Sequence, residues 1–315
     1  MRRANRRRLA LACALAALAA LGAAAGPAAA NRLSCNGERR LCHRPLDQVV
    51  LPATHNSMSA QALGWQIPNQ QVGIPEQLAA GVRGFLIDTY YAHVGPNGTL
   101  VNDPVPTPES GLYLCHIGCQ LGATPLADAL RAIRRFLRAN PANVLVIINE
   151  DYTRPEDFAR EVRRSGLLRH VYRGRLGPRW PTLRRLINRR KQVVMLTQGD
   201  GGPVPWYREG YQGLVQETPY NWPTVDPITN PANWNASCQP NRGGTTGGLF
   251  LLNHWSPPVA PNPAVSAVVN AAGTLEGRAK ACRALRGRMP TLVAVDMFQS
   301  GGLFEAVHRL NSAIR

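Results

Sequence analysis

The chain has 315 residues, 44% of them hydrophobic, and a formal net charge of +17, which leaves room for one large domain or two small ones. Nearly all of the positive charge is arginine, since only Lys191 and Lys280 are lysines. Such a surface favours anionic partners. No basic run is interleaved with aromatic residues, as nucleic-acid modules require, so nucleic acid is not an expected partner and the arginines are interpreted as solvated helix surface.

The first thirty residues have the pattern of a secretory signal. A basic start with five arginines precedes an Ala/Leu run from Leu9 to Leu21, and small residues lead up to Asn31. The apolar run is too short and too rich in alanine to favour a membrane-spanning helix, although an uncleaved anchor and twin-arginine export are alternatives. We therefore predict a signal over 1–30 with cleavage near Ala30, a single domain over 31–315, and a secreted or periplasmic protein.

Six cysteines remain after this segment, which is the even number expected of a disulfide framework outside the cytosol. Their spacing suggests two pairs of near neighbours and one distant pair, although six cysteines allow 15 arrangements. A zinc site is the alternative, but no C-x-x-C spacing repeats. The expected pairs are Cys35–Cys42, Cys115–Cys119 and Cys238–Cys282.

From residue 48 onward, apolar runs typical of buried strands alternate with segments typical of helices, which favours a parallel sheet. Seven or eight such units in roughly 285 residues fit one irregular (β/α)8 barrel of the TIM type, an α/β fold. An open doubly wound sheet is the alternative, but no glycine-rich phosphate loop follows the first strand. The predicted strands lie near 48–53, 83–88, 111–115, 143–149, 192–197, 248–253 and 291–296, with a candidate eighth at 212–216.

Two helices are clear from the pattern. The first should follow Thr124-Pro125, with the threonine as N-cap and the proline at the first helical position, and should end near Asn140. A second is predicted from Pro155 to Arg164. Residues 201–264 are rich in Pro, Gly, Asn and Trp and are predicted to form mainly long loops. The buried stripe expected of the first helix consists of Leu126, Leu130, Ile133 and Leu137.

Several apolar runs end on, or shortly before, a titratable residue. Parallel strands that deliver polar residues at their carboxyl ends bring them to one face of a barrel, which is where barrel enzymes build their active sites. The residues concerned are His55, Asp88, His116, Glu150, Asp200, His254 and Asp296.

Four motifs carry a resemblance to a known family: LPATHNS at 51–57, GVR…DTY at 81–90, LCH at 114–116 and INEDY at 148–152. In this order, and with the segments 253–255 and 292–296, the chain resembles the catalytic X region of phosphatidylinositol-specific phospholipase C, in its secreted single-domain bacterial and plant group. The resemblance covers most of the chain after the signal. It implies an irregular TIM-type barrel that cleaves the phosphodiester of phosphatidylinositol or a related inositol lipid through a cyclic phosphate.

The resemblance also implies roles for individual residues. His55 would act as the base, or stabilise charge, at the attacking inositol hydroxyl, and His116 would protonate the leaving alkoxide; imidazole suits both because its pKa lies near working pH. Arg83 is expected to face the phosphate, unless it only pairs with a carboxylate outside the site. From its strand-end position, Asp296 is expected to orient His55. The headgroup pocket is expected to include Asp200, His254 and Trp255.

Calcium is the cofactor implied. Asn56, Asp88 and Glu150 match positions that hold calcium in the metal-dependent branch of the family, and all are hard oxygen donors. Leu86 stands where that branch has a further carboxylate, and Asn149 could align in place of Glu150. The metal-independent branch has an arginine at the position of Asp88, so it fits this chain less well.

Other functions remain open at this stage. A catalytically silent barrel would bind phosphorylated headgroups or a partner protein. A glycosidase would use Asp88 and Glu150 as its paired carboxylates but would leave both histidines unexplained. A glycerophosphodiester phosphodiesterase usually begins its site with His-Arg-Gly, where this chain has residues 55–57, HNS. The expected partner is an inositol phospholipid or related phosphodiester, with peripheral membrane contact, and the expected state is a monomer.

Overall fold

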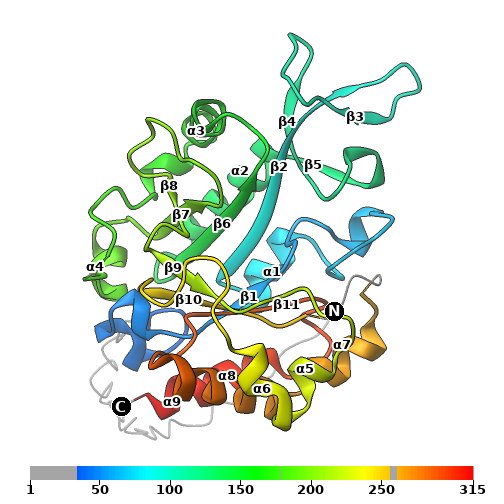
Figure 1. Cartoon of the computed structure of the whole chain (residues 1–315). Coiled ribbons are helices and arrows are strands. Elements are labelled where there is room, and N and C mark those ends of the chain that lie inside the picture. Colours follow the sequence, from blue (N-terminus) through cyan, green and yellow to red (C-terminus); the bar gives the residue numbers. More distant parts are fainter. Residues whose placement is uncertain (1–33, 178, 256–260, 315) are drawn as a thin grey trace, which may run out of the picture. The chain divides into compact units, whose positions relative to one another are not determined.

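The computed structural model describes residues 34–177, 179–255 and 261–314 (Figure 1). The predicted signal at 1–30 and its cleavage site lie outside these residues. Within the described ranges, none of the helices combines the length and the apolar character needed to cross a membrane.

A curled sheet of parallel strands forms the centre of the fold, in the order β8-β7-β6-β2-β1-β11-β10-β9. Among the described residues no ladder joins β8 to β9, so the barrel is incomplete there. This arrangement confirms the predicted irregular TIM-type barrel. The strands are β1 (Leu51–Thr54), β2 (Gly84–Val94), β6 (Leu145–Asp151), β7 (Val193–Thr197), β8 (Arg208–Glu209), β9 (Val215–Glu217), β10 (Leu249–Asn253) and β11 (Leu292–Val295).

One predicted barrel strand has a different place. The segment 111–115 forms β4 (Gly111–Cys115), which pairs antiparallel with the second half of β2 rather than joining the parallel path. The reason is the length of β2, whose 11 residues extend past the sheet and offer an edge to the chain that folds back. With β3 (Leu100–Asn102) and β5 (Ala123–Pro125), this extension projects at the top of Figure 1.

Helices cover the outside of the sheet, and α5 to α9 lie together below β10 and β11 in Figure 1. The stripe predicted for α2 is buried, but the helix begins at Leu126 without a side-chain cap because Thr124 is part of β5. The segment 201–264 contains short elements as well as loops. The helices are α1 (Ile74–Ala80), α2 (Leu126–Ala139), α3 (Pro155–Arg164), α4 (Leu183–Asn188), α5 (Asp226–Thr229), α6 (Trp234–Ser237), α7 (Pro263–Val269), α8 (Ala272–Arg286) and α9 (Leu303–Ala313).

Alternate residues of the barrel strands belong to two separate apolar clusters, because side chains of a strand point to opposite faces in turn. One cluster fills the barrel and includes Leu51, Ala53, Leu86, Val146, Ile148, Leu251, Leu292 and Ala294. The other lies between the strands and the helices and includes Val50, Phe85, Ile87, Ile147, Leu252, Val293 and Val295. The barrel strands other than β8, whose two residues are partly or fully exposed, are therefore buried on both faces. The side on which a residue lies follows from its position in this alternation.

The three expected disulfides are present: Cys35–Cys42, Cys115–Cys119 and Cys238–Cys282. The first two close short loops, and the third joins the residue after α6 to the middle of α8. A disulfide stabilises mainly by constraining the unfolded chain, and more for a longer loop, so Cys238–Cys282, with a sequence separation of 44, should contribute more than the other two.

Gly84 tests how tightly the barrel interior is packed. A Cβ at this position would lie 2.5 Å from Cδ2 of Leu292 and 2.6 Å from Cβ of Ala53. Gly84→Ala should therefore lower the free energy of unfolding by about 1–3 kcal/mol, measured by chemical denaturation. The matched control is Gly273→Ala in α8, where nothing lies within 4 Å of the new Cβ; it should raise stability by up to about 1 kcal/mol. Equal effects of the two changes would contradict this account of the barrel interior.

Candidate active site

Four titratable residues continue the inward alternation at the carboxyl ends of their strands. They are His55 after β1, Asp88 on β2, Glu150 on β6 and Asp296 after β11. The parallel register places their strands side by side, with Asp88 paired to Glu150, and with Thr54 paired to Val295 just before His55 and Asp296. The barrel therefore collects these side chains at one end.

The first histidine is held on several sides. Nδ1 of His55 donates a hydrogen bond to Oδ1 of Asp296 over 2.9 Å, which is the contact expected from the position of Asp296. The indole of Trp255 stacks on the imidazole with 3.9 Å between ring centroids and 2° between planes. The Gln70 side chain donates to the backbone oxygens of His55 and Val295. Nε2 of His55 has no partner among the described residues and can therefore accept or donate a proton.

The second histidine forms a matching pair from another part of the sheet. Nδ1 of His116 donates to Oδ2 of Asp88 over 3.0 Å, and Asp88 is buried. His116 follows β4 in a tight loop that the Cys115–Cys119 disulfide closes. The antiparallel pairing of β4 with the extended β2 brings this loop beside Asp88.

Burial and charge act in opposite directions on His116. Burial by itself lowers the pKa of the imidazole. The hydrogen bond that His116 donates to Asp88, and the negative charges of Asp88, Asp296 and Glu150, outweigh this effect, so the pKa of His116 is raised. The pKa of Asp88 is raised by its burial and by the neighbouring Glu150, against the opposing effect of His116. The surroundings of His116 are thus rich in carboxylates.

Two asparagines connect the pairs. Nδ2 of Asn56 lies 3.3 Å from Nε2 of His116 and 3.3 Å from Oδ1 of Asn69. Nδ2 of Asn69 in turn donates to Oδ1 of Asp296 over 3.1 Å. An unbroken chain of side-chain hydrogen bonds therefore runs from His116 through both amides to the partner of His55. Asn69 lies in a loop outside the apolar runs, where no sequence pattern marked it.

Backbone strain occurs next to these residues. Among the described residues, five non-glycine positions have positive φ, and three of them directly follow His55, His116 and Asp296. These are Asn56 (φ 42°), Ile117 (φ 64°) and Met297 (φ 46°). A left-handed β-branched residue such as Ile117 is costly, and such strain persists where the surrounding structure enforces it, often at functional sites.

The residues expected to hold calcium show a partial fit. Asp88 and Glu150 lie side by side as oxygen donors, with the Asn56 amide nearby, and Asn149 is instead buried against Thr89 and Tyr207. Leu86, two residues before Asp88, belongs to the barrel interior. Within the described part of the chain, no group of three or more His, Cys, Asp or Glu has an arrangement that could hold a metal ion. The donor set is thus two carboxylates and an amide.

Arg83 does not join the site, which corrects the expectation that it faces the phosphate. It precedes β2 at an outward position, so its side chain points to the helices. Nε donates to Oδ1 of Asn143, Nη1 donates to the backbone oxygens of Leu78 and Val82, and the guanidinium lies over Phe136. Burial lowers the pKa of Arg83 to about 10. Among the described residues Arg83 has no carboxylate partner, so the alternative of an ion pair outside the site is also wrong.

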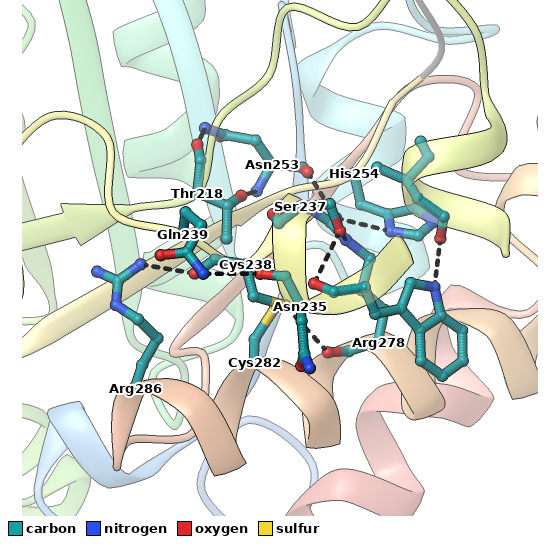
Figure 2. Close-up of a disulfide and its surroundings, with 12 residues drawn as sticks. Thr218, Asn235, Ser237, Cys238, Gln239, Asn253, His254, Arg278, Cys282 and Arg286 are labelled. Carbon is teal, nitrogen blue, oxygen red and sulfur yellow. Dashed lines mark hydrogen bonds between the residues drawn. A yellow bond between two sulfur atoms is a disulfide. The ribbon is translucent and has the colours of Figure 1, made fainter. Parts of the chain in front are cut away.

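His254 is likewise not in a headgroup pocket. It follows β10 at an outward position and is fully buried, with Nε2 on the backbone oxygen of Val269. Figure 2 shows Arg278 from α8 reaching to His254, Asn253 and Ser237 beside the Cys238–Cys282 disulfide. Burial and the charge of Arg278 lower the pKa of His254 to about 3. His254 is thus a neutral structural residue next to Trp255.

Asp200 is exposed and lies in the loop after β7, where its carboxylate accepts from the backbone of Gly202. It lines a cavity of about 490 Å³ with Tyr207 and Arg208, and neither histidine lines that cavity. Of the three residues expected to bind the headgroup, only Trp255 contacts a site histidine.

An arginine that sequence patterns did not indicate stands at the ends of β9 and β10. Arg242 forms an ion pair with the buried Glu217, with 2.7 Å between Nε and Oε1. Its guanidinium lies over the rings of Tyr211 and Tyr220, and Tyr220 contacts Trp255. This cation is partly exposed but largely neutralised by Glu217.

The raised pKa of His116 generates a prediction. Because the folded-state pKa lies above the unfolded value, protonated His116 stabilises the fold; this contribution is complete below the unfolded pKa of about 6.5 and is lost as pH rises through the folded pKa. Asp88→Asn should lower the pKa of His116, measured by NMR titration of the ring. The control is Asp103→Asn, which removes the corresponding partner of His93 and should leave His116 unchanged. An unaltered His116 titration in Asp88→Asn would contradict the assignment.

Comparisons with known proteins agree with this architecture. The family model PI-PLC X 1 matches residues 41–311. An uncharacterized secreted protein of Arthroderma benhamiae is 27% identical over 316 aligned residues, covering 91% of this chain and 66% of that protein. A PI-PLC X domain-containing protein of Arabidopsis thaliana is 25% identical, covering 86% and 63%. The chain therefore spans about two thirds of the length of these relatives. The secreted relative and the three disulfides fit an extracellular location.

Solved structures show the same fold. The phosphatidylinositol-specific phospholipase C of Listeria monocytogenes has a TM-score of 0.53 at 17% identity, covering 86% of this chain and 94% of that chain. The enzyme of Staphylococcus aureus has a TM-score of 0.56 at 12% identity, with the same coverage, in a study of the modulation of its membrane binding. At these identities the likeness concerns the fold alone. With the family match over most of the chain, it follows that the chain belongs to the PI-PLC X family.

Proposed function

We propose that this protein is a secreted phosphoric diester hydrolase that cleaves phosphatidylinositol, or a related inositol lipid, in the manner of a phospholipase C. The observation that carries the proposal is the presence of two His–Asp pairs at one end of the barrel, His55–Asp296 and His116–Asp88. Each carboxylate orients its imidazole through Nδ1, which leaves Nε2 of His55 without a partner among the described residues and places Nε2 of His116 beside the Asn56 amide.

The two imidazoles divide the reaction between them. Nε2 of His55 would accept the proton of the inositol hydroxyl next to the phosphate while that oxygen forms a bond to phosphorus. In its protonated form His116 would direct the Nε2 proton to the diacylglycerol oxygen instead of accepting from Nδ2 of Asn56, and would give up that proton as the bond from this oxygen to phosphorus breaks, which leaves a cyclic inositol phosphate. The raised pKa of His116 supports the acid role, because it keeps the ring protonated at higher pH. Trp255 and Tyr220 would form one wall of the headgroup site.

Calcium is proposed as the positive charge that this reaction requires. A phosphodiester is anionic, yet the charges that act on His116 are those of three carboxylates. Asp88 and Glu150, with the Asn56 amide, would hold the ion, which when bound stabilises negative charge on the phosphate oxygens. Burial and, to a smaller extent, the charge of Glu150 raise the pKa of Asp88, and a bound cation would offset both effects. Leu86, in place of a further carboxylate, favours weak binding.

Replacement of either histidine tests the catalytic proposal. His55→Ala and His116→Ala should each lower the release of water-soluble inositol phosphate from phosphatidylinositol by about 10²- to 10⁴-fold, because each removes one proton-transfer group. The measurement is phosphate release from detergent-dispersed lipid.

The matched control for these variants is His308→Ala. It removes an exposed histidine of α9 that pairs with Glu38, and the variant should retain full activity. Loss of activity in the control, or full activity in both site variants, would refute the assignment. Wild-type protein that binds inositol phosphate but never turns over lipid would instead establish the catalytically silent barrel, for which Leu86 is the supporting feature.

Metal removal gives a separate prediction. A chelator should lower phosphodiester cleavage at least about tenfold, and added calcium should restore it in the wild type. Glu150→Gln should raise the calcium concentration needed for half-maximal activity, because it weakens one of two carboxylate ligands. The measurement is activity against free calcium concentration. Turnover that resists the chelator would contradict the role of calcium. A side chain, with Arg242 as the candidate, would then have to stabilise the negative charge on the phosphate.

A further inference from the structure

A concentration of cations lies at the other end of the barrel. A cavity of about 560 Å³ is lined by Arg173, Arg175, Arg179, Arg185, Arg189 and Lys191. A second cavity of about 660 Å³ is lined by Arg134, Arg138, Arg169 and Arg190, together with His170. The two share the segment 189–191 between α4 and β7, and we call this surface the arginine face.

The arginine face lacks compensating acids. Neither cavity has an Asp or Glu in its lining, although the chain as a whole has 19 acidic residues for 36 basic ones. None of its ten cations forms an ion pair within the described residues, in contrast to Arg131, Arg160 and Arg309 on other helices. Single unpaired arginines such as Arg208 and Arg283 occur elsewhere in the described chain, so the distinguishing feature is the clustering of ten cations in linings without an acid. A merely solvated basic surface at this composition would contain acids as well.

The surroundings of Arg134 and Lys191 indicate that these charges are uncompensated. Nε of Arg134 is buried and has no hydrogen-bond partner in the described structure. Lys191 has its pKa lowered by burial and by the charge of Arg173, and its Nζ donates only to the backbone oxygen of Arg169. An anionic ligand in the cavities would supply the missing negative charge.

The position of the arginine face argues against a lipid bilayer as its ligand. Val171 and Tyr172 bond to Val193, the first residue of β7, so the face lies at the amino ends of the strands. The site histidines lie at the carboxyl ends. A bilayer bound to the arginine face would hold the proposed lipid site away from its substrate, an argument that rests on the proposed function. The two cavities also lack exposed apolar side chains of the kind that enter a membrane.

We propose that the arginine face binds a linear polyanion that carries repeated phosphate or sulfate groups. Two neighbouring cavities joined by Arg189 and Arg190 suit a ligand with several charges along its length rather than a single anion. Guanidinium groups bind phosphate and sulfate oxygens through paired hydrogen bonds and remain charged at all relevant pH. Such binding would attach the secreted protein to an anionic polymer while its opposite end stays open.

The first experiment titrates fluorescently labelled long-chain polyphosphate and heparin with the purified protein and follows anisotropy. We expect binding of at least one polymer at 50 mM salt and an affinity at least about tenfold lower at 200 mM, because several counterions are released together. Stronger binding of polyphosphate would identify phosphate chains as the ligand, and stronger binding of heparin would identify sulfated glycans. Binding of neither polymer at low salt would overturn the proposal.

Charge reversal tests the location. Arg173→Glu combined with Arg189→Glu should lower polymer affinity at least about tenfold. Arg208→Glu combined with Arg283→Glu makes the same change in net charge at exposed arginines outside both cavities and should change affinity less than twofold. Arg173→Lys with Arg189→Lys keeps the charge and should retain salt-dependent binding. Equal losses in the two reversal variants would overturn the proposal in favour of attraction by net charge alone.

A third experiment asks whether the arginine face binds a polymer or a membrane surface, and whether its binding is independent of the proposed catalysis. Vesicles of phosphatidylcholine with phosphatidylglycerol should bind the arginine face more weakly than the polymer does; binding as strong as the polymer's, and equally dependent on Arg173 and Arg189, would overturn the proposal. The Arg173→Glu, Arg189→Glu variant should hydrolyse detergent-dispersed phosphatidylinositol at the wild-type rate. Polymer binding is measured without turnover, so an inactive barrel would leave this result intact.

Discussion

The parallel register between β1 and β11 is the constraint on which the site depends. Because Thr54 is paired with Val295, the next residue of each strand emerges at the same level, and His55 meets Asp296 without any adjustment of a loop. A slip of one residue would turn one of the two side chains to the outer face and separate them. The pairing of Asp88 with Glu150 across β2 and β6 follows the same rule.

The outer wall of the site is held by buried polar contacts rather than by apolar packing alone. Arg278 is fully buried without a carboxylate partner, and burial lowers its pKa to about 9. Arg278 donates to the hydroxyl and backbone oxygens of Ser237 at the end of α6 and to the backbone oxygen of Asn253 at the end of β10, so it connects α8 to the strand two residues before Trp255. Figure 2 shows these contacts of Arg278. Removing one partner of such a buried charge is costly. Arg278 thus holds the residues directly before Trp255, which stacks on His55, although Arg278 itself does not touch the site.

Charge is distributed unevenly over this basic protein. The end of the barrel with the histidines gathers Asp88, Glu150 and Asp296, while the arginine face gathers cations without acids. An acidic pocket suits a cation-assisted reaction on an anionic substrate, and a basic surface at the other end suits a different, polyanionic ligand. The family match establishes the fold and the family, and the chain spans about two thirds of its curated relatives.

The sequence by itself indicated the barrel class, a disulfide framework and the two histidines, because buried strands, an even cysteine count and ordered motifs are local signals. The spacing of the cysteines suggested the three pairs, and the tertiary structure decided among the possible arrangements. It also contained, in the alternation of each strand, the information that Arg83 and His254 point outward, since they are one residue out of phase with Leu86 and Leu251. Only the tertiary structure decided that β4 leaves the barrel, that Asn69 connects the two His–Asp pairs, and that Arg242 stands beside Tyr220. Those contacts join residues far apart in the chain through loops, and loops carry no periodic pattern from which a partner can be inferred.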